Sequence, residues 1–311
     1  MITQEQTEFQ RRLDAAAWQN EIVQLPAGGI DVYDTPLIAH GCVIAGRLPF
    51  ATPHPVRRLA DIRLHQSSRP GVLLKGPGAG LFNCVIDYPN NGTDFPPPAP
   101  PAVRAVSGGV CIRDVVLYGA YDGLRLEDAG HTEVTGFCAQ VFNVGIYLSG
   151  ANDVARLKQI HLWPNTTTRR DVLKLAYYPP GNGRGIVIEN SSWLHMDDVF
   201  VGWAHVGVQL LGRGPQVASG VSITAGTIQI DACTVGIDAY DIMANDVIII
   251  NALKVAGNTT DGANPLTGMI LRGTDGDVQV GQYHLHGEIA DDWRLEGFPR
   301  NRLMIGTMLR R

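Results

Sequence analysis

A four-residue phrase recurs along residues 123–293: a glycine, an apolar residue, any residue and a second apolar residue. It begins at six glycines, the last two in a less regular form: Gly123, Gly145, Gly185, Gly207, Gly236 and Gly268. The first and third intervals between these glycines are equal, and the other three are longer. A basic period of about 22 residues, lengthened in places, indicates a repeated structural unit that carries inserted loops.

Each repeat contains very short strands. A glycine followed by apolar, any and apolar residues predicts a strand with alternating faces. A second alternating piece usually follows, as residues 199–201 follow residues 194–196. One repeat cannot bury an apolar face alone, but a chain that coils and stacks each turn on the previous one can. The pattern predicts an all-β, right-handed parallel β-helix, with the handedness that parallel crossovers prefer.

A sandwich or barrel of irregular short strands is the alternative fold. The constant phase of the glycine and the near-absence of hairpin dipeptides such as Asn-Gly favour the solenoid. A chain of 311 residues is long enough for a substantial core. Its 36 glycines and 18% charged residues fit apolar strands joined by tight turns.

The charge and hydropathy of the chain argue against two kinds of partner. A formal net charge of −5 gives no electrostatic case for binding nucleic acid or an anionic membrane. The N-terminus is polar and lacks the apolar core of a signal sequence. No apolar run approaches the length of a membrane span. We therefore expect neither nucleic-acid binding nor membrane insertion.

Residues 1–20 are predicted to form a short N-terminal capping helix. Thr3 can cap it, and Gln6 three positions later completes a capping box. The apolar side chains that share one helix face are Phe9, Leu13 and Ala16 or Ala17. A β-helix exposes its core and strand edges at its open end, and a short amphipathic helix can cover them. A docking helix for a partner is the alternative.

The opening of the chain resembles that of the pectate-lyase-like β-helix family. The matching segments are FQ at 9–10 with LDAA at 13–16, LPAG at 25–28 and GCVIAG at 41–46. They resemble most closely the opening of phage tailspikes and related virion β-helix proteins, and also that of some extracellular polysaccharide lyases and hydrolases. The resemblance implies a pectin-lyase-like solenoid, but it specifies activity only weakly because one fold hosts many functions.

The leading functional prediction is a bacteriophage virion structural protein that is tailspike-like or decorates the particle. The resemblance implies a homotrimer that contacts other virion proteins and a host surface polysaccharide. The expected location is the virion, with an extracellular location as the alternative. One alternative function is a polysaccharide lyase or glycoside hydrolase that uses paired carboxylates. A non-catalytic carbohydrate-binding module is the other.

After the helix, residues 21–311 are predicted to form a single β-helix domain with inserted loops near 47–70, 89–104 and 163–184. Loops on a rigid scaffold often carry function. Aromatic rings stack on sugar faces while polar side chains bind the hydroxyls. The predicted glycan-binding residues in and after the third loop are Trp163, Arg169, Tyr177, Tyr178, Trp193 and Trp203. The alternative is that this loop packs between subunits.

Three carboxylates are the candidates for acid–base catalysis if the protein is an enzyme: Asp197, Asp198 and Asp231. Adjacent strand residues point to opposite faces, so only one of Asp197 and Asp198 is expected to face outward. That residue would pair with Asp231 or Asp238 from neighbouring turns. The alternative is that these residues bind backbone amides in turns. Family motifs do not assist, because Ser219 and Gly220 stand where pectin hydrolases have Gly-His-Gly.

Cysteine and histidine spacing gives no metal motif. Three of the five cysteines are equally spaced, at Cys84, Cys111 and Cys138, and equal spacing predicts buried, reduced thiols in a core ladder. His284 and His286 share one face of a predicted strand. A third zinc ligand is not identifiable, so neither a metal nor a cofactor is predicted.

Overall fold

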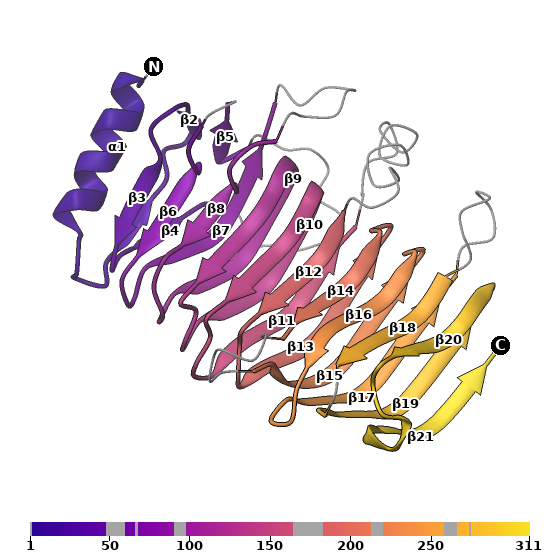
Figure 1. Ribbon diagram of the computed structural model, residues 1–311. Helices are drawn as coiled ribbons and strands as arrows, with labels where there is room; N and C mark the ends of the chain where they lie inside the picture. The colour runs from indigo at the N-terminus through magenta and orange to yellow at the C-terminus, as the bar shows by residue number, and fades with distance from the viewer. Residues whose placement is uncertain are drawn as a thin grey trace.

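The computed structural model describes residues 2–47, 60–65, 68–89, 98–163, 183–212, 220–257, 266–273 and 275–311. These residues form one α-helix at the N-terminus and a long stack of strands, with the two termini at opposite ends (Figure 1). No helix among them is long and apolar enough to cross a lipid bilayer.

The elements have the following bounds: α1 (Gln4–Ala15), β1 (Ile22–Gln24), β2 (Ile30–Val32), β3 (Leu37–His40), β4 (Val43–Ala45), β5 (Ile62–Leu64), β6 (Val72–Lys75), β7 (Gly80–Asp87), β8 (Val103–Ala105), β9 (Cys111–Glu127), β10 (Glu133–Ser149), β11 (Ala155–Leu162), β12 (Arg184–Glu189), β13 (Leu194–Gly202), β14 (Val206–Leu211), β15 (Ser222–Asp231), β16 (Val235–Ile242), β17 (Val247–Ala256), β18 (Leu266–Gly273), β19 (Asp277–His286), β20 (Ile289–Glu296), a 3₁₀ helix (Arg300–Arg302) and β21 (Leu303–Arg310).

Strand pairing establishes a parallel β-helix. In the first turns β1, β2 and β3 lie on β4, β5 and β6, and every pairing is parallel. In the later turns β11 and β12 lie on β13 and β14, which lie on β15 and β16. The turn from Arg156 to His195 is much longer than the turn from Cys111 to Glu133. The longer turn contains residues 164–182, which are outside the described part of the chain.

The six glycines of the recurring phrase occupy one position in successive turns, which confirms the repeat. From Gly123 to Gly236, an added Cβ would lie no more than 2.7 Å from the carbonyl oxygen of the next glycine. Real Cβ atoms do not approach backbone oxygen this closely. Glycine is therefore required because the backbones of adjacent turns meet here.

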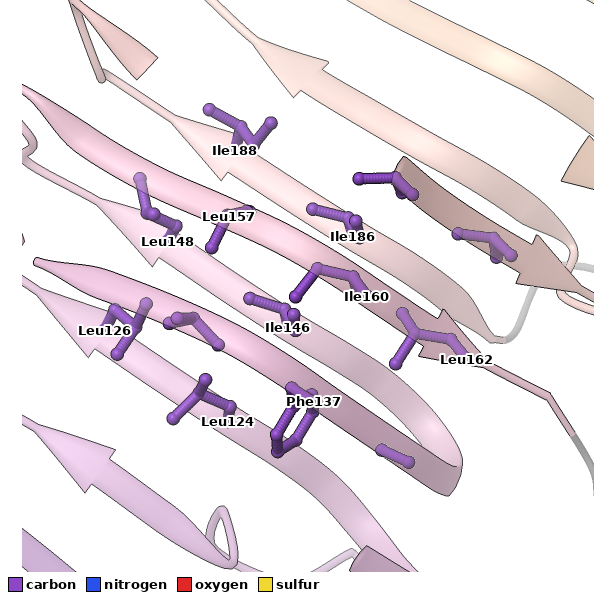
Figure 2. Packing of buried hydrophobic residues seen from close by; sticks show 14 of the residues in the cluster. Leu124, Leu126, Phe137, Ile146, Leu148, Leu157, Ile160, Leu162, Ile186 and Ile188 are labelled. Atoms are coloured by element: carbon purple, nitrogen blue, oxygen red, sulfur yellow. The ribbon is translucent and has the colours of Figure 1, made fainter. Parts of the chain in front are cut away.

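Inward side chains form columns through the stack. Leu124, Ile146 and Ile186 lie one above another from β9 to β12, as Figure 2 shows. Phe137 and Ile160 form a neighbouring column. All five are at most 1% exposed. Burial of one such side chain stabilises the fold by about 2 kcal/mol, so stacking supplies the core that a single turn lacks.

Helix α1 covers the N-terminal end of the stack. Phe9, Leu13 and Ala16 are buried, and the helix lies against β2 and β3. The Gln10 side-chain amide donates to the Ile38 carbonyl and accepts from the Ile38 N–H, both at 2.9 Å. The helix therefore covers apolar surface and also satisfies backbone groups on the open edge of β3.

The predicted capping box is only half correct. The Thr3 hydroxyl accepts from the Gln6 N–H at 3.0 Å, so Thr3 is the N-cap. The Gln6 side chain does not return to Thr3. Its Nε2 donates to the Thr35 carbonyl at 2.5 Å, because Gln6 is buried where the helix meets the strands.

The predicted cysteine ladder is wrong. Cys84 is buried, but its neighbours in the next turns are Val115 and Phe137. Cys111 and Cys138 are only partly buried and lie in two other columns. Gly80 pairs with Cys111, which pairs with Glu133, so two successive turns differ in length. Equal spacing along the sequence therefore does not give equal positions in the coil.

Thiol reactivity checks this arrangement. Burial raises the pKa of every cysteine, that of Cys138 to about 11 and that of Cys233 to about 12. At pH 8 a disulfide reagent should therefore modify at most Cys111 and Cys138 in the native protein, and slowly, because the thiolate is the nucleophile. All five should react after unfolding in guanidinium. Rapid native modification of Cys84 or Cys233 would contradict the core placement.

Candidate functional site

A cleft of about 560 Å³ lies on the outer face of β13, β15, β17, β19 and β21. In β13, β15, β17 and β19, alternate residues near the end of the strand face the cleft on either side of a buried apolar residue. The outward side chains that line the cleft are Phe200, Gln229, Asp231, Lys254, Ala256, His284, His286, Leu309 and Arg311.

Strand register arranges the cleft side chains in two rows. In the first row, Phe200 pairs with Gln229, which is followed by Lys254, His284 and Leu309 on successive strands. The second row consists, in order, of Gly202, Asp231, Ala256 and His286. Ala256 thus stands between Asp231 and His286, each about 4.8 Å away across the sheet. Its small side chain leaves a recess between them.

The charged side chains that line the cleft comprise two cations and one carboxyl among the described residues. Lys254 and Arg311 are exposed cations, and Asp231 is a half-buried carboxyl. Burial raises the pKa of Asp231, although the Ala232 N–H and the charge of His286 act in the opposite direction. A carboxyl with a raised pKa holds its proton to higher pH than an ordinary one. The cleft therefore suits a ligand that has anionic groups together with hydroxyls.

An aromatic shelf, defined by His161, Trp163 and Phe200, adjoins the cleft. The Phe200 ring centroid lies 4.8 Å from that of His161 and 5.4 Å from that of Trp163. The Trp163 ring lies over Gly202, where a Cβ would collide with it. Phe200 belongs to both the shelf and the cleft, so an aromatic surface continues directly into the polar groups.

The structure brings together only part of the predicted glycan surface. Trp163 and Trp203 meet edge to face at 6.0 Å, but Trp203 is only 6% exposed and packs in the core. Trp193 lies at the other end of β13 and is 66% exposed. The three remaining predicted residues, Arg169, Tyr177 and Tyr178, lie outside the described residues.

The predicted carboxylates do not meet. Asp198 has φ 52°, which breaks strand alternation, so Asp197 and Asp198 are both exposed; the expectation that only one faces outward is wrong. Asp231 pairs with Gly202, which lies beyond Asp198 by roughly 13 Å along the strand. Glycosidase carboxylates are separated by about 5–9.5 Å. Asp231 lies in the cleft, whereas Asp197 and Asp198 do not line it.

His284 and His286 do share the outward face, as the sequence indicates, and both line the cleft. No group of three His, Cys, Asp or Glu side chains suited to a metal ion occurs among the described residues. The absence of a cofactor stays a prediction.

Sequence reasoning missed Gln229, Lys254 and Arg311 as site residues. Gln229, Lys254 and His284 lie at unequal intervals along the chain, and each opens a triplet with an apolar residue in the middle. That recurring triplet is the signal that could have found them. It becomes informative only when the unequal turn lengths are known.

No family model matches the chain, and no curated protein matches it. Among solved structures, it is similar to the A-module of the mannuronan C-5 epimerase AlgE4 of Azotobacter vinelandii, with 12% identity over 95% of this chain and 94% of that chain and a TM-score of 0.34. At that identity and score the likeness carries no argument about fold or activity. The strand pairing itself defines the class: this is a parallel β-helix protein.

Proposed function

We propose that the protein binds a glycan and is a structural protein of a bacteriophage particle, tailspike-like or decorating the particle, and homotrimeric. The observation that carries glycan binding is the cleft beside the aromatic shelf. Rings offer apolar faces to sugar rings, and amide, imidazole and ammonium groups bind hydroxyls. The virion assignment is supported by the resemblance of the opening residues to tailspike proteins.

The two cleft rows favour a polymer over a single sugar. Equivalent side chains repeat about every 4.8 Å along the stack because adjacent strands are spaced that way. This interval is close to the length of one pyranose unit in an extended chain. A polysaccharide lying along the stack can therefore contact Phe200, Gln229 and Lys254 with successive sugars.

Removal of the shelf ring nearest the cleft tests glycan binding. The Phe200→Ala variant should bind bacterial surface polysaccharides about tenfold more weakly, because it loses a stacking face. Isothermal titration calorimetry against a polysaccharide panel measures the affinity. Phe82→Ala is the matched control, since Phe82 lies half-buried on the same sheet outside the shelf and cleft. Equal affinities for the two variants would reject the shelf as the binding surface.

A polysaccharide lyase or glycoside hydrolase is the second candidate, and Asp231 favours it. A half-buried carboxyl with a raised pKa, two strands from a histidine of the same row, is a candidate proton donor or acceptor. Incubation of a bound polysaccharide with the protein would then release reducing ends or create a double bond. Asp231→Asn should abolish that release, and the polymer should still bind through the aromatic shelf. If the protein binds a polymer but does not cleave it, the lyase or hydrolase function is rejected and the binding function stands.

A further inference from the structure

We propose that the recess over Ala256 is a subsite for a carboxylate group of the glycan, held by Lys254, His284, His286 and Arg311. The proposal rests on the proposed function, because it names the class of glycan that the cleft accepts: one that carries carboxylated sugars such as uronic or sialic acids.

The shape of the second row supports a subsite at Ala256. Two of its members are small, Gly202 and Ala256, and each leaves a hollow on the outer face. The Trp163 ring fills the hollow over Gly202. The hollow over Ala256 belongs to the cleft and is flanked by Asp231 and His286. The space at Ala256 is therefore open to a substituent of a ligand.

The charges around the recess support an anion. Several arginines elsewhere on the surface are paired, as Arg63 is with Asp31 at 2.7 Å and Arg104 with Glu127 at 2.7 Å. Among the described residues, no side-chain carboxylate lies within 4.0 Å of the charged nitrogens of Lys254 or Arg311. Hydrogen bonds from cations to a carboxylate are about twice as strong as neutral ones.

Among the described residues, Asp231 is the one side-chain carboxyl that lines the recess, and its negative charge would repel an anionic ligand. The charged and titratable groups that line the cleft with it are Lys254, His284, His286 and Arg311. Burial raises the pKa of Asp231, which weakens its negative charge relative to an ordinary aspartate. Its oxygens can meet a hydroxyl of the same sugar, so Asp231 orients the ring while the cations hold its carboxylate.

The test fills the recess and compares ligands that differ only at the carboxyl group, which reduction converts to a primary alcohol. Alginate, polygalacturonate and polysialic acid are titrated calorimetrically before and after chemical reduction of their carboxyl groups. The wild type should bind at least one acidic polymer about tenfold more tightly than its reduced form. Ala256→Val should lose that preference. Ala252→Val is the matched control, because Ala252 is also partly exposed on β17 but does not line the cleft.

The outcomes distinguish failure of the carboxylate subsite from failure of glycan binding. Equal affinity for acidic and reduced polymers would overturn the carboxylate subsite and leave glycan binding standing. No binding of any polymer in either form would overturn both. If Ala256→Val fails to fold, Lys254→Gln replaces it, because Lys254 is exposed. Retention of the full acidic preference by that variant would also overturn the subsite.

Discussion

Replacement of Gly185 by alanine should lower the free energy of unfolding by about 3 kcal/mol. An added Cβ would lie 2.6 Å from the Gly207 carbonyl oxygen and would also collide with the Val201 side chain. The backbone oxygen cannot move without disturbing the ladder between β12 and β14. Urea unfolding followed by circular dichroism measures the loss.

Gly28→Ala is the control for this substitution. Gly28 is exposed and has nothing within 4 Å of an added Cβ, so its change should lie within about 0.5 kcal/mol of zero. A Gly185→Ala variant as stable as Gly28→Ala would contradict the close approach of turns that defines the glycine ladder.

Truncation of Phe137 to alanine should lower the free energy of unfolding by about 4 kcal/mol. Phe137 is 1% exposed and lies between Val115 and Ile160 of the adjacent turns. The substitution removes contacts with both neighbours and leaves a cavity between two turns. The strands that hold the two turns together prevent them from closing over the cavity. The same urea experiment gives the value.

Phe82→Ala serves again as the comparison, because the Phe82 ring is only partly buried and faces outward with Arg113 above it. Its loss should be about 1 kcal/mol. Similar losses for both variants would show that Phe137 is not enclosed by its neighbouring turns.

The fold could be predicted because the close approach of adjacent turns requires a glycine that recurs in the sequence. From Gly123 to Gly236, the backbones of adjacent turns approach closely at the recurring glycine, and glycine alone fits there. The N-cap is also local, so Thr3 was predictable, whereas the burial of the Gln6 side chain depends on packing of the helix against strands. Features that depend only on neighbouring residues, such as the glycine repeat and the Thr3 N-cap, could therefore be predicted from the sequence.

The cleft could not be predicted because it depends on register between turns. Gln229, Lys254 and His284 come together only through turns of unequal length. Unequal turn lengths are also the reason why the predicted cysteine ladder is wrong. Asp198 shows a further limit: a left-handed residue at a corner breaks the alternation from which side-chain direction is inferred. The residue types at this corner do give a sequence signal, because Asn83 and Asp114 share the positive φ of Asp198 and Asn and Asp tolerate that conformation.

A crystal structure of the protein with an oligosaccharide from a polymer that it binds would show whether the cleft is the glycan site. Sugar density should lie along the cleft, with a ring on Phe200 and further units beside Gln229 and Lys254. A carboxylate should lie over Ala256. Sugar bound at Trp193, at the opposite end of β13, with an empty cleft would show that the cleft is not the glycan site.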